Sequence, residues 1–426
     1  MFAESSNARL SFIEEVTWGT TPAEDFQRMR FKGTTLAATL DFTTSEEITP
    51  SASVTDVIPT GAGAGGDISY ELSYGPELIT LIEHAVRGTM DAFGIIKGSD
   101  DKKSLSVCKE LVIDAVNSAF FLYQGARMNS WSVDLTVDGN TPIGGTFNLT
   151  AKGEEHSDAD PTTASYDAAN SNPVFSMPHL RGVAVTGIAG AVCFSDLSFT
   201  VENNLRAQNG KCTDTTVYPD LASKGIGYGQ RNITGNVNAY LANLNIYDEY
   251  KTFGEFSLSF IMSDGVRAFK VTMPRIKITD GSAPAEGNDS DVLQPFTYQA
   301  LYDTTEETDV IIEAIESIET DAGIKVTGVA PVPDWQGTFY DDGTLNDLKP
   351  VYKSVGYTAA EATEPSAIWW STADSAWTIT AYSDIGTFPT TGGWWENATA
   401  GAPTGAFSVG GTATGTLSGA AYNPLA

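Results

Sequence analysis

The sequence repeats one order of elements twice, and this repeat constrains the fold more than any single motif. In the first copy, a strand expected at 36–42 leads through a glycine-rich stretch to a second strand, which opens at Gly66 and runs into a helix. The helix is expected at 76–87, because Pro76 suits a first helical turn and the apolar residues after it form one stripe. A hairpin and a returning strand at 145–152 complete this copy.

A second copy follows in the same order. Its first strand is expected at 194–201, its second strand opens at Gly235, and a helix follows near Ile246. A hairpin at 256–279 and a returning strand at 295–302 close the copy. Two copies of one order of elements predict two tandem modules of the same architecture.

Alternation of apolar and polar residues recurs along the chain, as in "DISYELSY" at 67–74. The 41 glycines, together with abundant threonine, serine and valine, are typical of short strands joined by tight turns. A change of composition follows an acidic linker expected at 312–323. We therefore expect a mainly β protein, with modules at 1–160 and 161–320 and a small all-β domain, immunoglobulin-like or similar, at 321–426.

Gly61, Gly63 and Gly66 satisfy the G-x-G-x-x-G pattern of many dinucleotide-binding turns. That mechanism needs a buried strand before the glycines and a helix that opens directly on them. Pro59 is a poor occupant of a central strand, and an alternating strand follows the glycines instead of a helix. The matching glycines of the second copy, which begin at Gly225, lack the spacing. We therefore expect a flexible connection and no bound cofactor.

Acidic residues outnumber basic residues by 54 to 24, and the resulting net charge of −30 argues against wrapping nucleic acid. Three separated cysteines form neither a disulfide framework nor a zinc cluster, and no apolar run reaches the length that spans a bilayer. His84, His156 and His179 are scattered, with no nucleophile motif beside them. The sequence thus predicts no catalytic residue, no metal site, no membrane insertion and no enzymatic activity.

The C-terminal domain holds six of the eight tryptophans. Two adjacent pairs stand out, Trp369 with Trp370 and Trp394 with Trp395. Exposed aromatic faces stack on sugar rings, so these four residues are candidate glycan contacts. The alternative is that they form the core of a small sandwich poor in aliphatic residues.

Several separated stretches resemble the tail tube proteins, or major tail proteins, of long, non-contractile-tailed bacteriophages of the siphovirus type. They are "RLSFIEEVTWGTTP", "VTDVIPTGAGAGGDISYELSYGPELITLIEHAVRG", "LSFTVENNLRAQ" and "IGYGQRNITGNVNAYL", and the resemblance covers residues 1–320. It implies rings that stack into the hollow tube through which genomic DNA leaves the capsid. It also implies that each module is a β-sandwich with a flanking helix, whose inner strands join those of neighbouring modules into a barrel. The C-terminal domain has a weaker similarity to β-domains that decorate virions.

The resemblance also implies partners and a location. Two modules in each chain favour a ring of three chains with pseudo-sixfold symmetry, and a ring of six chains is the alternative. Further partners would be the tape measure protein and the terminator and tip proteins of the tail. The protein would be made in the host cytoplasm and end in the virion tail. DNA would pass without specific binding, because carboxylates repel its phosphates.

Under this resemblance the glycine-rich stretch becomes a candidate contact between stacked rings that becomes ordered on assembly. An idle surface loop is the alternative. The candidate residues are Thr55, Asp56, Val57, Ile58, Pro59, Thr60, Gly61, Gly63 and Gly66. A different class of function also stays open, that of a carbohydrate-binding adhesin or surface-layer β-protein.

Overall fold

A computed structural model of the chain describes most of the first 316 residues with their side chains and the strand backbones of the rest. The described ranges are 2–48, 53–91, 94–114, 116–136, 141–161, 165–188, 193–208, 223–284, 287–288 and 291–316, followed by the strands β21 to β28. The chain divides into two compact units, of which the first comprises 1–89, 96–264 and 269–314.

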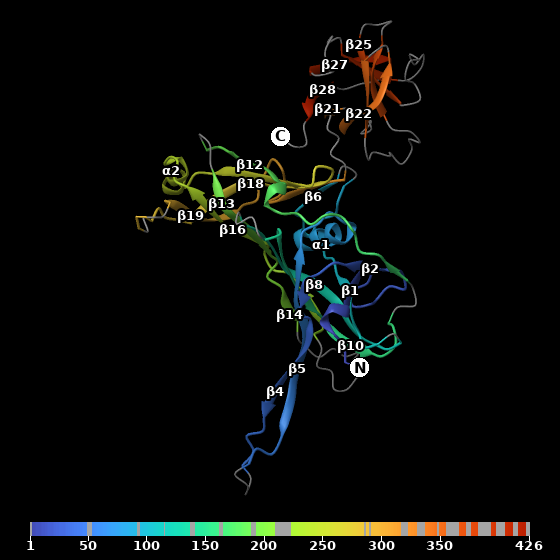
Figure 1. Cartoon of the computed structure of the whole chain (residues 1–426), viewed down its shortest axis with the longest axis vertical. Helices are drawn as coiled ribbons and strands as arrows, with labels where there is room; N and C mark the ends of the chain where they lie inside the picture. The colour runs from blue at the N-terminus through green and yellow to red at the C-terminus, as the bar shows by residue number, and fades with distance from the viewer. Residues whose placement is uncertain are drawn as a thin grey trace. The chain divides into compact units, whose positions relative to one another are not determined.

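The first unit is dominated by one sheet of eighteen strands. This confirms the expected mainly β fold (Figure 1). Its elements are η1 (Ser5–Asn7), β1 (Ala8–Glu14), β2 (Phe26–Met29), β3 (Gly33–Thr34), β4 (Ala37–Thr44), β5 (Val57–Glu71), α1 (Pro76–Val86), β6 (Ile95–Lys97), β7 (Leu105–Val112), β8 (Ser118–Thr136), β9 (Gly144–Ala151), β10 (Gly153–Ser157), β11 (Tyr166–Asp167), η2 (Met177–His179), β12 (Leu180–Thr186), β13 (Phe194–Glu202), β14 (Arg206–Gln208), β15 (Gly225–Gly227), β16 (Asn232–Tyr240), α2 (Asn245–Thr252), β17 (Phe256–Ser263), β18 (Ala268–Gly281), β19 (Leu293–Ala300) and β20 (Ile311–Ile315).

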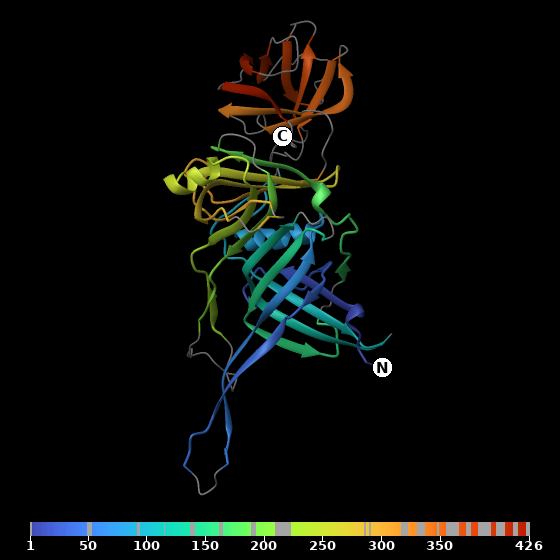
Figure 2. The same cartoon turned by 60° about the vertical axis from the view of Figure 1, so that its left-hand side comes forward.

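Eight strands from both copies of the repeat form one continuous antiparallel layer, which we call the wall. Its order is β4–β5–β9–β8 from the first copy, followed by β13–β16–β19–β18 from the second. Both views show the strands of the two copies running on from one another (Figures 1 and 2). The wall therefore contains two four-stranded sets in the same order.

The repeat expected from the sequence is present strand for strand. In the first copy β9 lies between β5 and β8, and in the second copy β19 lies between β16 and β18. Gly66 faces Leu149 in the first copy as Gly235 faces Tyr298 in the second. A Cβ atom at Gly235 would collide with the Tyr298 ring, which crosses over it so that its hydroxyl donates to the carbonyl of Ser198. The two glycines thus serve close packing in a sheet.

Two irregularities recur at matching places. The last wall strand of each set shifts register, after Met128 in β8 and after Ile278 in β18. Each helix ends on a residue in the left-handed conformation, Arg87 with φ 57° after α1 and Phe253 with φ 58° after α2, and a glycine follows each. Arg87 and Phe253 are therefore counterparts, although their side chains differ completely.

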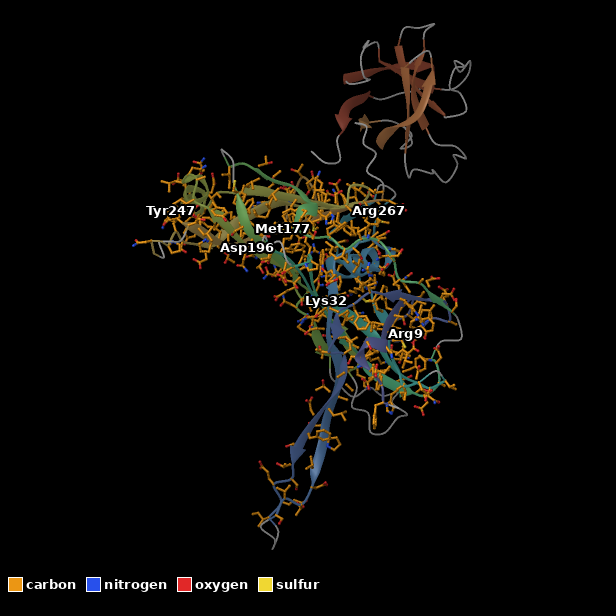
Figure 3. All side chains as sticks on the ribbon, in the orientation of Figure 1. Arg9, Lys32, Met177, Asp196, Tyr247 and Arg267 are labelled. Atoms are coloured by element: carbon orange, nitrogen blue, oxygen red, sulfur yellow. The ribbon has the colours of Figure 1, made fainter. Side chains whose placement is uncertain are left out.

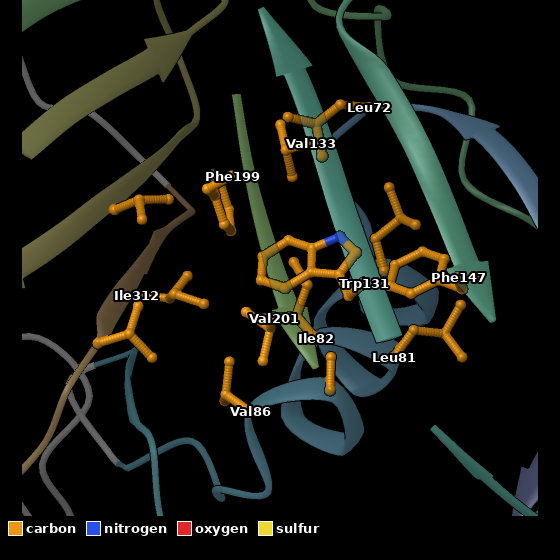
Figure 4. Close-up of a cluster of buried hydrophobic side chains, with 14 of the residues drawn as sticks. Leu72, Leu81, Ile82, Val86, Trp131, Val133, Phe147, Phe199, Val201 and Ile312 are labelled. Atoms are coloured by element: carbon orange, nitrogen blue, oxygen red, sulfur yellow. The ribbon is translucent and has the colours of Figure 1, made fainter. Parts of the chain in front are cut away.

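The core of the first copy lies between the wall, α1 and a second layer made by β1, β2, β7 and the first part of β8. Trp131 is at its centre (Figure 4). Its ring lies parallel to Phe147 at 6.1 Å and edge-on to Phe199 of β13 at 5.1 Å. Its Nε1 donates to the hydroxyl of Tyr70 at 2.7 Å, which donates in turn to the carbonyl of Ser132. The core therefore extends across the boundary between the copies.

Two expectations about local structure were wrong. The glycine-rich stretch is not a flexible connection, because residues 57–66 belong to β5 and pair with β4 and β9. Pro59 is accommodated because β9 pairs with β5 only from residue 64 onward, which leaves one edge of β5 open at the proline. The expected acidic linker also begins as structure, since residues 311–315 form β20. The helices expected in each copy are confirmed as α1 and α2, the two α-helices of the described residues.

The second unit contains a small all-β domain, as expected, in the form of a closed antiparallel barrel and not of an immunoglobulin-like sandwich. Its strands are β21 (Gly323–Val329), β22 (Gly337–Asn346), β23 (Lys349–Ser354), β24 (Ser366–Ser371), β25 (Ala376–Ala381), β26 (Gly393–Asn397), β27 (Gly405–Gly411) and β28 (Thr416–Tyr422). Each strand pairs with the next, and β28 pairs back to β21. Closure leaves no open sheet edge.

His84 is a buried titratable group in α1, with 1% of its surface exposed. Its Nε2 lies 3.6 Å from Oε1 of Glu14, and Lys103 ion-pairs with both Glu14 and Glu83 beside it. Burial lowers the pKa of His84 despite the neighbouring carboxylates. The imidazole in turn holds the pKa of Glu14 below its usual range.

We expect Gly66→Ala to lower the free energy of unfolding by about 1–3 kcal/mol, because Gly66 has φ +145° and a Cβ would lie 2.7 Å from the Thr35 backbone. Gly63→Ala is the matched control, because nothing lies within 4 Å of a Cβ there. It should raise stability by about 0.4–1 kcal/mol through the unfolded chain. Urea unfolding of both variants checks this, and equal effects would contradict it.

We also expect α1 to lose stability as pH falls below about 6.5, the ordinary pKa of histidine, because the unfolded chain then binds a proton that buried His84 resists. The loss should approach about 1.4 kcal/mol per pH unit until the folded pKa is reached. Glu14 contributes separately at lower pH, as protonation removes a carboxylate stabilised by its neighbours. Hydrogen exchange of α1 amides in the protein and in His84→Gln measures the slope, which should flatten in the variant.

Candidate assembly surfaces

One face of the wall is built from short polar side chains. Buried and less buried residues alternate along its strands, as β13 shows with Leu197, Phe199 and Val201 buried. The opposite face carries hydroxyl, amide and carboxylate groups. Its members include Asp67, Ser69, Glu71, Ser130, Ser132, Asp134, Thr136, Thr146, Asn148, Thr150, Asp196, Ser198, Thr200, Glu202, Asn232, Thr234, Asn236, Asn238, Thr297 and Gln299. We call this the polar face. Two bases, Arg127 and Lys277, also lie on it by register, opposite Thr150 and Gln299, and the acids outnumber them.

Polar pairs join neighbouring strands at equivalent positions of the polar face. The amide of Asn148 donates to Asp67 at 2.7 Å between β9 and β5. At the matching position of the second copy, Thr297 donates to the amide oxygen of Asn236 at 3.0 Å. These bonds partly satisfy the side chains within the sheet, so the face presents fixed polar groups and few free donors. Asp196, at the start of β13, marks this face in Figure 3.

The two copies are joined by strand pairing between β8 and β13. Residues 130–136 of β8 pair with residues 196–202 of β13, and Trp131 faces Val201. Just past this pairing, the amide of Asn203 donates to the carbonyls of Ala85 in α1 and Met128 in β8, at 2.9 and 3.1 Å. Asn203 is fully buried. The junction within the chain is therefore fixed by backbone pairing, by apolar packing and by a buried amide.

The wall has an open edge at each end. The described registers pair β4 with β5 alone and pair residues 276–281 of β18 with β19. The strand β18 also pairs with β20, and Lys270 lies 3.5 Å from Glu313, so β20 lies beside the start of β18 and leaves its end open. Comparing registers makes Ala37 of β4 the counterpart of Thr200 of β13. Likewise, Ser282 after β18 corresponds to Ser132 of β8. Because Thr200 faces Ser132 within the chain, the two open edges have the geometry to pair with each other in separate copies.

The strand β4 and residues 57–63 of β5 form a projecting hairpin, which we call the β-arm (Figures 2 and 3). All of β4 is exposed. Opposite residues share a face of a hairpin, so its registers divide the β-arm into two faces. The polar side holds Thr39, Asp41, Thr43, Gly61 and Gly63, with Ile58 as its one large apolar residue in the described β-arm; the other holds Leu40, Phe42, Val57, Pro59 and Ala62. The apolar side continues from buried Ala64 and the polar side continues into the polar face.

The candidate ring contact residues are therefore brought together on one element, the start of β5 and the two residues before it. Their role as a contact between rings stays a prediction. Sequence reasoning missed the apolar side of the β-arm, although alternation at Leu40 and Phe42 signals it. Trp369 and Trp370 lie in β24 and Trp394 and Trp395 in β26, two strands that both pair with β25. Their contact with glycans also stays a prediction.

The described residues hold no group of three or more His, Cys, Asp or Glu side chains placed to bind a metal ion. Cys108 is buried, and desolvation raises the pKa of its thiol to about 12, whereas Cys193 is exposed. Among the described helices, none is both long and apolar enough to cross a membrane.

The search of curated proteins finds no match to this chain. A family profile does match, over residues 5–300, and its description is phage tail tube protein. The match includes both copies of the repeat and the whole wall. The chain therefore belongs to the phage tail tube protein family, a structural family without enzymatic activity.

Proposed function

We propose that this protein assembles into rings that stack as the tube of a long, non-contractile phage tail. The observation that carries the proposal is the pairing of β8 with β13, which joins two equivalent strand sets side by side. The same pairing between β18 of one chain and β4 of the next chain would extend the wall from chain to chain. A twisted sheet that continues in this way closes on itself, and closure removes its exposed edges.

Three chains would supply six equivalent strand sets, which gives a ring with pseudo-sixfold symmetry. The register at each new boundary follows from the counterparts. Ala37 would face Ser282 of the next copy, and Thr39 would face Asp280. A ring of six chains would use the same contacts in a wider barrel.

The polar face would line the channel of the ring. Its carboxylates and short polar groups give DNA phosphates no attractive site, so a genome would pass through without specific binding. The net charge of −30 favours the same behaviour. The other side of the wall is buried under its own helices and second layer, and cannot serve as the channel surface.

The outer part of the β-arm would reach the next ring, where its exposed Phe42, Val57 and Ile58 would be covered. This retains residues 55–66 as the ring contact, in the form of a hairpin. Tape measure, terminator and tip proteins would complete the tail, after synthesis in the host cytoplasm. The C-terminal barrel would decorate the outside of the virion, with its tryptophan pairs as candidate glycan contacts.

We expect the variant Ala37→Cys/Ser282→Cys to form disulfides between chains, because directly opposite residues of paired strands have Cβ atoms about 4.5–5.5 Å apart. Cys193 and Cys212 are replaced by serine in this background. Oxidised rings should run as covalent trimers on a denaturing gel, and electron microscopy should show tubes of uniform width with a central channel.

The variant Ser132→Cys/Thr200→Cys is the positive control, because these residues face each other within one chain. It should form its disulfide without joining chains, and each single cysteine variant should remain uncrosslinked at this position. Tubes that assemble without any bond between residues 37 and 282 would contradict the proposed register. A protein that stays monomeric would contradict the proposed function.

We expect lysine at Asp134 and Asp196 to slow the passage of DNA, because both residues lie on the polar face beside the junction. Genome release from virions carrying the double variant, followed by dye binding to released DNA, should slow by an order of magnitude or more. Lysine at the exposed Asp158 and Asp248 makes the same change in net charge away from the polar face. Equal slowing by both double variants would argue against a channel lined by this face.

A further inference from the structure

The junction inside the chain has a polar lock on its apolar side. Asn203 and Arg231 both donate to carbonyls in the last turn of α1, those of Ala85 and Val86, at 2.9 and 3.0 Å. Arg231 also forms a two-pronged ion pair with Asp309. The wall strands of the second copy are thereby tied to the helix of the first copy.

Arg87 completes the lock from the helix end. Its guanidinium group lies over the ring of Tyr228, 4.4 Å from the ring centre, and it also contacts the carbonyls of Asp100 and Asp101. Only 6% of its surface is exposed. The residue after α1 is therefore a main contact between the helix of the first strand set and the connection from β13 to β16 in the second set.

The counterparts of these lock residues are apolar, and two of the three are exposed. By register, Leu40 corresponds to Asn203 and Ala62 to Arg231, and these two residues face each other in the β-arm. Phe253 corresponds to Arg87 as the left-handed residue after α2. Leu40 is 54% exposed and Phe253 is 74% exposed. The donors of the lock are thus replaced by groups that neither donate nor accept.

We propose that Phe253 of one chain packs against Leu40 and Ala62 on the β-arm of the neighbouring chain in the same ring. This inference rests on the proposed ring, and it names the side-chain contact that seals each boundary between chains. The contact occupies the place that the polar lock occupies within the chain. Helix α2 is positioned for it, because Tyr250 lies against Gly281 at the open edge of the wall.

The surface formed by Leu40 and Ala62 binds a second chain, because this contact continues an interface that each chain already contains between its two repeats. The β8–β13 junction fixes how far a helix end lies from the strand set beside it. If β18 of one chain lies beside β4 of the next chain in the same register, Phe253 comes to Leu40 without a conformational change in either chain. Both side chains are exposed in the single chain, so the contact leaves the folded subunit as it is.

The test is ring formation by Leu40→Asp and by Phe253→Asp, measured by light scattering and electron microscopy. Each variant should fold as the unaltered protein does, because both positions are exposed, and each should need at least tenfold more protein to form rings. Val116→Asp and Phe2→Asp are matched controls at residues 90% and 94% exposed, and they should assemble normally. The Leu40→Cys/Phe253→Cys pair, without Cys193 and Cys212, should link neighbouring chains on oxidation.

Normal assembly of both aspartate variants, without a disulfide between residues 40 and 253, would overturn the inference. If the 37–282 disulfide still formed in that case, the proposed ring would stand and only this contact would fall. If neither disulfide formed and the protein stayed monomeric, the proposed function would fall, and the inference with it. A 40–253 disulfide within a single chain would also overturn it.

Discussion

The structure depends on the pairing of one strand edge with another, between β8 of the first copy and β13 of the second. An exposed sheet edge carries unpaired N–H and C=O groups and therefore seeks a partner. Within the chain this need is met once, at the junction, while β4 and the end of β18 keep the same need open. Because the two repeats have matching registers, the open edges of two chains can pair in the way that β8 and β13 pair within one chain. The proposed ring, its channel face and its side-chain seal would all follow from that match.

The wall separates two kinds of chemistry by strand alternation alone. Side chains on one side enter the core around Trp131, and those on the other side form the polar face. The β-arm keeps this division beyond the body of the protein, since Ala64 is buried and the residues before it continue its apolar side. One alternating pattern thus sets both the polar face, which we propose lines the channel, and the apolar side of the β-arm, which we propose contacts another chain. A shift of one residue in the register would exchange the two surfaces.

The sequence predicts the repeat, both helices and the equivalence of Gly66 and Gly235 in the two repeats, because these signals are local. It does not predict that residues 57–66 form a strand, because Pro59 and four glycines weaken strand propensity and only the partner strand β4 compensates. Nor does local alternation show that β20 follows β19 in the first unit, since an acidic composition hides its buried Ile312. The contrast between Asn203 and Leu40 depends on aligned registers that only the structure supplies. The proposed channel face likewise depends on which side of the wall α1 covers, which the sequence does not show.

The polar junction within the chain and the proposed apolar junction between chains would differ because the second one forms only when folded chains meet. The junction inside the chain forms within one polypeptide, so the buried amide nitrogen of Asn203 has both of its carbonyl acceptors in the same chain. A buried donor without a partner costs about 1–3 kcal/mol, and that cost would apply to any chain that had not yet joined a ring. Exposed Leu40 and Phe253 carry no such penalty before assembly, and burying their surface contributes about 25 cal/mol per Å² once copies meet. Chains that associate after folding are therefore most stable with hydrogen bonds at the β8–β13 junction within each chain and apolar contacts at the proposed junction between chains.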